Sequence, residues 1–158
     1  MLEPEERRKN LIEGFKKDIV KLQEACQSLK YYCKEVKKLD LHHVYDRKDL
    51  RTLDILSDHF ARLYRIITDE FFIVITILED YKVHWTHKDR FFFQDMLELK
   101  LIDDIETFEK IKKLKRSIRG EFIIYDQVKL YEDIFSYAEI LYETADRVEK
   151  FVKERYKA

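Results

Sequence analysis

The stretch from Leu11 to Val36, LIEGFKKDIVKLQEACQSLKYYCKEV, predicts the fold most directly. Its apolar residues recur at intervals of three and four: Leu11, Phe15, Ile19, Leu22, Cys26, Leu29, Cys33 and Val36. That spacing returns to one side of an α-helix at every turn and leaves charged residues on the other side. It predicts one long amphipathic helix, which begins just after Pro4, a residue suited to a first turn, and ends near Leu39.

The same period predicts a second long helix. It begins near Asp49 as its cap, and its apolar face extends from Leu53 to Leu78. The segment from Phe71 to Leu78 is apolar nearly all round and partly β-branched, so a strand is the alternative there. No break signal interrupts the helical period, and we therefore expect a helix with its most buried part in this segment.

Three further helices are predicted in the rest of the chain. One is expected over residues 87–100. The next begins at Asp103, which has the spacing of a capping box from Glu106, and ends at Gly120 in a left-handed C-terminal cap. Asp126 is expected to cap a closing helix that continues nearly to the end. About five helices with short links indicate an all-α fold, an up-and-down bundle.

The composition agrees with such a bundle. Hydrophobic residues make up 46% of the 158 residues and charged residues 40%, and Gly 2 and Pro 1 leave little material for the tight turns of a β fold. Nothing strongly marks a domain boundary, so residues 1–158 are expected to form one domain. The net charge of -1 excludes a globally basic nucleic-acid-binding protein, so any such surface has to be local.

Two features concern the location of the protein. The N-terminus is too charged for a signal peptide, and the longest apolar run, Phe71 to Leu78, is too short to span a membrane. We therefore expect a cytoplasmic protein without a membrane partner. Cys26 and Cys33 lie seven residues apart on one helix face, about 10 Å along the axis, which is too far for a disulfide and favours buried thiols.

Motifs for metal or cofactor binding are absent from the sequence. His42 and His43 with Asp46, or His84 with His87, could in principle bind a metal. We place these histidines in links or across a helix start rather than on a shared helix face, so we expect solvated histidines and no metal site. The sequence also lacks a glycine-rich phosphate loop, CxxC, HExxH and GxSxG, so no cofactor is expected.

A basic run ends the predicted fourth helix. Six basic residues and no acid lie between Lys110 and Arg119. On a helix, Lys112, Arg116 and Arg119 form one stripe, with Lys115 beside it. Such a stripe could bind the phosphates of RNA or of a nucleotide, with arginine offering bidentate geometry. The alternative is a solvated helix end, where cations are favoured by the helix dipole.

Four blocks of sequence carry a family resemblance: LDILSDHFARLY at 53–64, DRFFFQDMLELKLID at 89–103, IETF at 105–108 leading into LKRSIRGEF at 114–122, and the long closing helix. In this order they resemble the HEPN domains, an all-helical family often found beside minimal nucleotidyltransferases. Family members carry Leu-Arg-Asn-x-x-x-His-x-Tyr at the third block. In ribonuclease toxins of the family, the Arg and His serve RNA cleavage. In some toxin–antitoxin pairs, the Tyr accepts nucleotide from the partner nucleotidyltransferase.

The residues that define this chemistry are altered here. Laid on the family pattern, Lys115 stands at the Arg position, Arg116 at the Asn position, Gly120 at the His position and Phe122 at the Tyr position, with Glu121 anchoring the alignment. Gly120 cannot transfer a proton, Phe122 has no hydroxyl, and Lys115 keeps a charge but loses the planar fork. The resemblance therefore implies a catalytically degenerate member without catalytic residues, which acts as a nucleotide- or RNA-binding or protein-interaction module. The candidate binding residues are Lys112, Lys115, Arg116, Arg119 and Glu121.

The resemblance also implies partners and leaves an alternative function open. It implies a homodimer, and it makes a minimal nucleotidyltransferase a candidate partner, to which this chain would be a helical subunit. The alternative is an active, metal-independent ribonuclease with a relocated acid/base. A slip of one residue would place Glu121 at the His position behind Arg116, and His59 or His87 could approach in three dimensions.

Overall fold

The computed structural model describes residues 2–43, 46–79, 89–118 and 126–158, and it confirms the all-α fold. These residues form helices and links, and none of them lies in a strand. The elements are α1 (Pro4–Lys37), α2 (Arg47–Arg65), the π-helix η1 (Ile66–Phe72), α3 (Ile73–Leu78), α4 (Asp89–Glu98), α5 (Ile105–Ile118) and α6 (Gln127–Tyr156). Because α2, η1 and α3 follow one another without a link, the described residues build five helical rods, as the sequence predicts.

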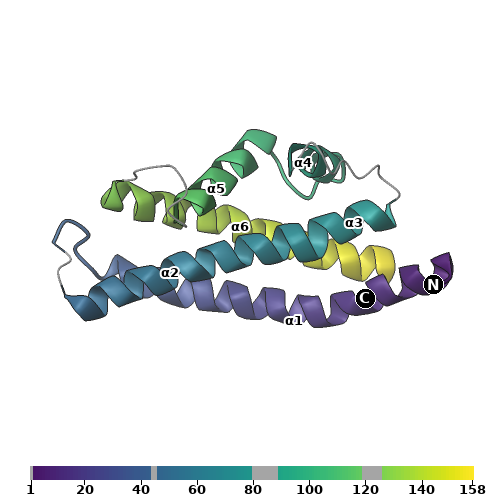
Figure 1. Cartoon of the computed structure of the whole chain (residues 1–158), viewed down its shortest axis with the longest axis horizontal. Coiled ribbons are helices and arrows are strands. Elements are labelled where there is room, and N and C mark those ends of the chain that lie inside the picture. Colours follow the sequence, from purple (N-terminus) through teal and green to yellow (C-terminus); the bar gives the residue numbers. More distant parts are fainter. Residues whose placement is uncertain (1, 44–45, 80–88, 119–125) are drawn as a thin grey trace.

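Three long rods form the body of the bundle. Figure 1 shows α1 antiparallel to both the α2–η1–α3 rod and α6, and α1 contacts both of them. The shorter helices α4 and α5 lie together on the opposite side from α1, and α4 is seen nearly end-on, so it crosses the long rods. Helix α5 packs on α2 and on α6. The start of α1 and the end of α6 lie at the same end of the bundle.

The buried residues of α1 follow the predicted seam with one difference. Phe15, Leu22 and Leu29 are buried as predicted, whereas Cys26 is only half-buried and the neighbouring Ala25 is fully buried in its place. Along this seam α1 contacts two neighbours, α2 and α6.

A cluster of phenylalanines fastens the short helices to the long rod. The ring of Phe108 in α5 lies 5.5 Å from that of Phe93 in α4 and 5.9 Å from that of Phe72 in η1, measured between ring centroids. All three side chains are at most 1% exposed. Burying a phenylalanine contributes about 1.5–3 kcal/mol each, so this cluster largely fixes where α5 sits.

The segment from Phe71 to Leu78 is helical, as predicted, but the π-helix before and within it was not. Phe71 and Phe72 are adjacent and both are fully buried against different partners: Phe71 stacks on Phe15 of α1 at 5.5 Å, and Phe72 faces α4 and α5. A π-turn inserts one extra residue and changes the direction of the side chains that follow. The hydroxyl of Thr68 donates to the Tyr64 carbonyl at 3.0 Å, which supplies that carbonyl with a partner within the altered turn.

The structure corrects the predicted cap of the second helix. Asp46, not Asp49, is the N-cap of α2, and its carboxylate accepts the backbone N–H of Lys48 at 2.6 Å. Asp49 lies inside the first turn, where its charge still favours the positive end of the helix dipole.

The predicted cap of the fourth helix is also wrong by one residue. Asp104 accepts the backbone N–H groups of Glu106 and Thr107 at 3.1 and 3.2 Å, and so caps α5. Asp103 instead receives the Arg147 guanidinium at 2.8 Å, which ties this link to α6. The predicted cap of α6 is confirmed, since Asp126 accepts the Lys129 N–H at 3.0 Å, whereas Gly120 lies outside the described residues.

Candidate nucleic-acid interface

The predicted basic stripe lies on α5, whose other side is anchored in the core. Phe108, Ile111 and Leu114 are buried, and this fixes the rotation of the helix. Lys112 and Lys115 are half-buried and Arg116 is exposed. Lys112 and Arg116, four residues apart, share a face as predicted. Three further residues of the family alignment, Gly120, Glu121 and Phe122, and the stripe residue Arg119 all lie outside the described residues.

Lys115 joins α5 to the last turn of α2. Its ammonium nitrogen lies 5.4 Å from the ring centroid of Tyr64, within the range of a cation–π contact. Tyr64 is 2% exposed, so the contact sits at the edge of the core. In the sequence of α2, Tyr64 lies between Arg62 and Arg65, which are the basic residues of that helix's last turn. The structure thus brings the cationic ends of two helices together.

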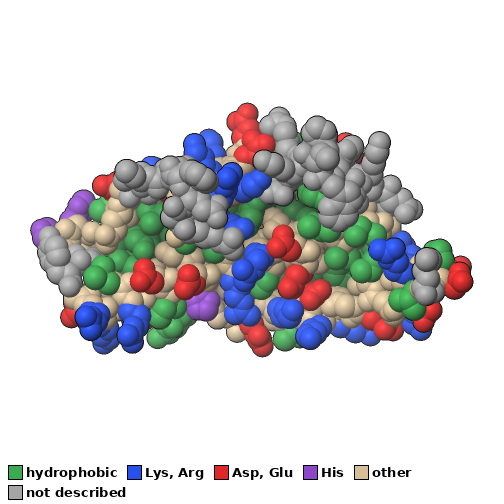
Figure 2. All heavy atoms as spheres, in the orientation of Figure 1, with side chains coloured by type: hydrophobic (Ala, Val, Ile, Leu, Met, Phe, Trp, Pro, Cys, Tyr) green, Lys and Arg blue, Asp and Glu red, His purple; other side chains and the backbone are tan. Residues whose placement is uncertain are grey.

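We define the basic band as Arg62 and Arg65 of α2 together with Lys112, Lys115 and Arg116 of α5. Figure 2 shows Lys and Arg side chains gathered over α5 and across the middle of the α2–η1–α3 rod. Arg62 is half-buried and Arg65 is exposed. Sequence reasoning did not find these two arginines, because they belong to no charge run. Their spacing of three residues at a helix end was the available signal.

Beside Arg62, three rings in contact with one another extend from α2 to α1: His59, Tyr32 and Tyr31. The His59 imidazole stacks on the ring of Tyr32, with centroids 5.0 Å apart and planes 16° from parallel. Tyr31 meets Tyr32 edge-on, also at 5.0 Å. Burial lowers the pKa of His59, and the nearby Arg62 lowers it further, so the imidazole is neutral at neutral pH. His59, a candidate acid/base for the alternative ribonuclease function, therefore lies beside one arginine of the basic band.

The cysteines do not form a reactive pair. Cys33 is buried, Cys26 is half-buried, and neither is in a disulfide. Burial raises the pKa of the Cys26 thiol to about 11, so it is protonated at neutral pH. Cys33 accepts the Tyr142 hydroxyl at 3.8 Å. Cys33 is therefore a core thiol, as the sequence predicts, whereas Cys26 lies at the edge of the core.

The linker histidines have a structural role where the chain is described. His43 and the backbone N–H of His42 both bond the Asp40 carboxylate at 3.0 Å, which closes a turn after α1. Within the described ranges, no group of three or more His, Cys, Asp or Glu side chains is placed to hold a metal ion. His84 and His87 lie outside those ranges.

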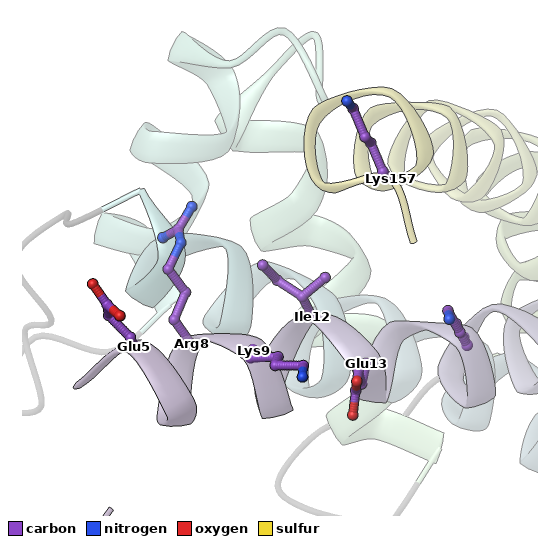
Figure 3. A pocket seen from close by; sticks show the side chains of 7 residues that line it. Glu5, Arg8, Lys9, Ile12, Glu13 and Lys157 are labelled. Carbon is purple, nitrogen blue, oxygen red and sulfur yellow. The ribbon is translucent and has the colours of Figure 1, made fainter. Parts of the chain in front are cut away.

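A second cationic region lies at the end of the bundle where the two termini meet. A groove of about 360 Å³ is lined by Glu5, Arg8, Lys9, Ile12, Glu13, Lys16 and Lys157. Figure 3 shows Arg8 and Ile12 on the side of α1 that faces the end of α6. Arg8 is already engaged there, since it donates to the Leu78 carbonyl at 2.8 Å and lies 6.0 Å from the Tyr156 ring centroid. Glu5 and Glu13 offset two of its four cations.

Comparison of the chain with protein-family models, with curated proteins and with solved structures gave no match. The likeness to HEPN domains therefore stays a prediction from the four sequence blocks. None of the described helices combines the length and the apolar character that crossing a membrane requires.

Proposed function

We propose that this protein binds RNA or a nucleotide through the basic band, and that it does so as a catalytically degenerate, cytoplasmic helical protein of the HEPN type. The contact between Lys115 and Tyr64, 5.4 Å from nitrogen to ring centroid, is the observation that carries the proposal. It joins α5 to the last turn of α2, the turn that carries Arg62 and Arg65, so the band draws cations from two helices. A solvated helix end would not require a second helix to supply matching charge.

The electrostatics of the chain favour a local interface of this kind. The whole chain has a net charge of -1, so a surface that attracts phosphate has to be local, and the basic band gathers five cations from two helices. Phosphate contacts of such a band release counterions, and binding must weaken as salt rises. The core side of α5 is fixed by buried residues, so the helix that carries Lys112, Lys115 and Arg116 is in place before the ligand arrives.

The test is a salt titration with matched variants. The ligand is a fluorescent single-stranded RNA of mixed sequence, about 12 nucleotides long, followed by anisotropy at about 50 to 200 mM salt. Lys115→Ala with Arg116→Ala, and separately Arg62→Ala with Arg65→Ala, should each weaken binding. Each pair should reduce the slope of log K against log salt by about 1.4, because each phosphate contact on a single strand contributes about 0.7.

The control removes two charges at a distance from the band. Lys150→Ala with Lys153→Ala changes two exposed lysines near the end of α6 and should leave the slope unchanged. If all three double variants bind as tightly as the wild type, the basic band is only a helix end and the proposal is wrong. If all three weaken binding equally, the attraction is unspecific.

A second candidate function is an active ribonuclease with His59 as the relocated acid/base. The observation that favours it is the neutral imidazole of His59 beside the positive charge of Arg62. A neutral imidazole can accept a proton, and an adjacent arginine can stabilise developing negative charge. Cleavage of RNA at stoichiometric protein, abolished by His59→Asn, would support this function. Absence of cleavage by the wild type under the same conditions would exclude it for the RNAs tested.

The proposed partners follow from the HEPN likeness and have their own test. We expect a homodimer, which light scattering after size-exclusion chromatography distinguishes from a monomer. A minimal nucleotidyltransferase is the expected second partner. Its gene beside this one, or its co-purification with the tagged chain, would support a subunit role, whereas a monomer without such a companion would contradict both.

A further inference from the structure

The aromatic side chains that adjoin the basic band carry an inference about the ligand. Tyr31 is 58% exposed, unusually open for a large side chain, and it is held on α1 at the outer end of the three-ring array. We propose that the ligand is single-stranded RNA, one of whose bases stacks on Tyr31 while its phosphates follow the basic band. This proposal rests on the proposed function and adds the class of ligand and a residue outside the band.

The array holds Tyr31 in a fixed place. Tyr32 is half-buried and stacks on His59, so α1 and α2 together support the ring that Tyr31 contacts. Tyr31 meets Tyr32 at 90°, with ring centroids 5.0 Å apart. Whichever of the two rings contributes its edge, at least one face of Tyr31 stays uncovered by Tyr32. An open aromatic face on a supported ring is what a nucleobase needs for stacking.

The path from the array to the band is continuous. Each of the two ring contacts, Tyr31 to Tyr32 and Tyr32 to His59, measures 5.0 Å. His59 lies close enough to Arg62 for the guanidinium to lower its pKa. From His59 to Tyr64, where Lys115 docks, α2 rises about 8 Å at 1.5 Å per residue. A ligand that touches both ends must therefore extend over several nucleotides.

This arrangement selects a single strand over a duplex. In an RNA duplex the base faces are stacked inside the helix and are closed to a tyrosine ring, whereas a single strand can splay a base outward. Alternating cations and aromatic rings are the usual combination at surfaces that bind single strands without reading sequence. The negative charges near this region include Asp58, next to His59, and Glu35, which pairs with Lys38 at 2.9 Å.

The deciding variant is Tyr31→Ala, which removes the ring and no charge. It should weaken binding of the single-stranded RNA about 5- to 150-fold, because stacking on one aromatic ring contributes that much per base. The slope of log K against log salt should stay at the wild-type value, since no phosphate contact is lost. Tyr31→Phe keeps the ring and should bind like the wild type. Val20→Ala, another exposed apolar side chain of α1, is the matched control and should have no effect.

The outcomes separate this proposal from the proposed function. If Tyr31→Ala binds as tightly as the wild type while the band variants weaken binding, the stacking role is wrong and the basic band stands. If the band variants also leave binding unchanged, the proposed function itself fails. A duplex of the same sequence that binds as tightly as the single strand overturns the single-strand preference. If Tyr31→Ala changes the oligomeric state in light scattering, Tyr31 belongs to a protein contact and the stacking role is overturned.

Discussion

Replacing Phe108 by alanine should destabilise the protein by about 3–5 kcal/mol. Phe108 is 1% exposed, and its ring lies 5.5 Å from Phe93 and 5.9 Å from Phe72. These three side chains come from three different rods, so the cavity left by the ring closes only if a whole helix moves. We therefore expect a cost at the upper end of the range for buried phenylalanines.

Urea denaturation followed by circular dichroism measures this loss. A domain of this size has a total stability of about 5–15 kcal/mol, so the midpoint should fall steeply while the dependence on urea stays similar. Phe108→Leu keeps most of the volume and should cost less than about 1.5 kcal/mol. Phe135→Ala in α6 is the matched control, because that ring is only half-buried and its loss should cost clearly less than the loss of Phe108.

Two results would refute the reasoning. A loss below about 1 kcal/mol for Phe108→Ala would mean that the phenylalanine cluster does not hold α5 against the long rod. A loss equal to that of Phe135→Ala would mean that burial of the ring does not decide its contribution. Either result would also weaken the argument that the basic band is fixed in place by the core behind it.

Three further predictions concern charges and thiols. Arg155 holds the pKa of the Glu79 carboxyl below its ordinary 4.5, so the ion pair stabilises the fold above that pH and stops doing so as the pH falls through the lower pKa of the folded state. The urea midpoints of the wild type and of Glu79→Gln should therefore differ at pH 7 and converge below pH 4.5. A difference that persists in strong acid would contradict this. Asp104→Ala should lower the thermal midpoint more than Asp103→Ala does, because only Asp104 caps α5. A larger loss for Asp103→Ala would indicate that Asp103 is the cap. The reaction of Cys26 with a disulfide reagent should accelerate about tenfold per pH unit between about pH 7 and 10, and a plateau near pH 9 would contradict a pKa of about 11.

The long helices were predictable because their signals are local and repeated. The period of three and four over Leu11 to Val36 predicts α1 whatever its neighbours are, and the same holds for α6. The caps were less predictable, since α2 and α5 each have two aspartates within three residues of their start. The position of the first helical turn decides which aspartate is the cap, and the sequence pattern does not predict that position to the residue.

The π-helix and half of the basic band depend on tertiary contacts. The π-turn serves two adjacent phenylalanines that are buried against different helices, and those helices are distant in sequence. Arg62 and Arg65 join the band only because α5 crosses α2 at Tyr64. The sequence shows the charge run on α5 by itself. Tyr31 was also missed, because a lone exposed tyrosine has no pattern until its neighbours are known.

The π-helix η1 also restricts the length of the chain. Residues before it face α1 and α5 from α2, whereas residues after it, such as Ile75, enter the core in α3. Because the π-turn takes up one extra residue, an ordinary α-helix with the same number of residues would rotate α3 by about 100° relative to α2. Phe72 could then no longer meet α4 and α5 while Phe60 keeps its place. Deleting one residue between 66 and 72 should therefore keep the direction of α3 by restoring an α-turn, whereas inserting one more residue should rotate α3.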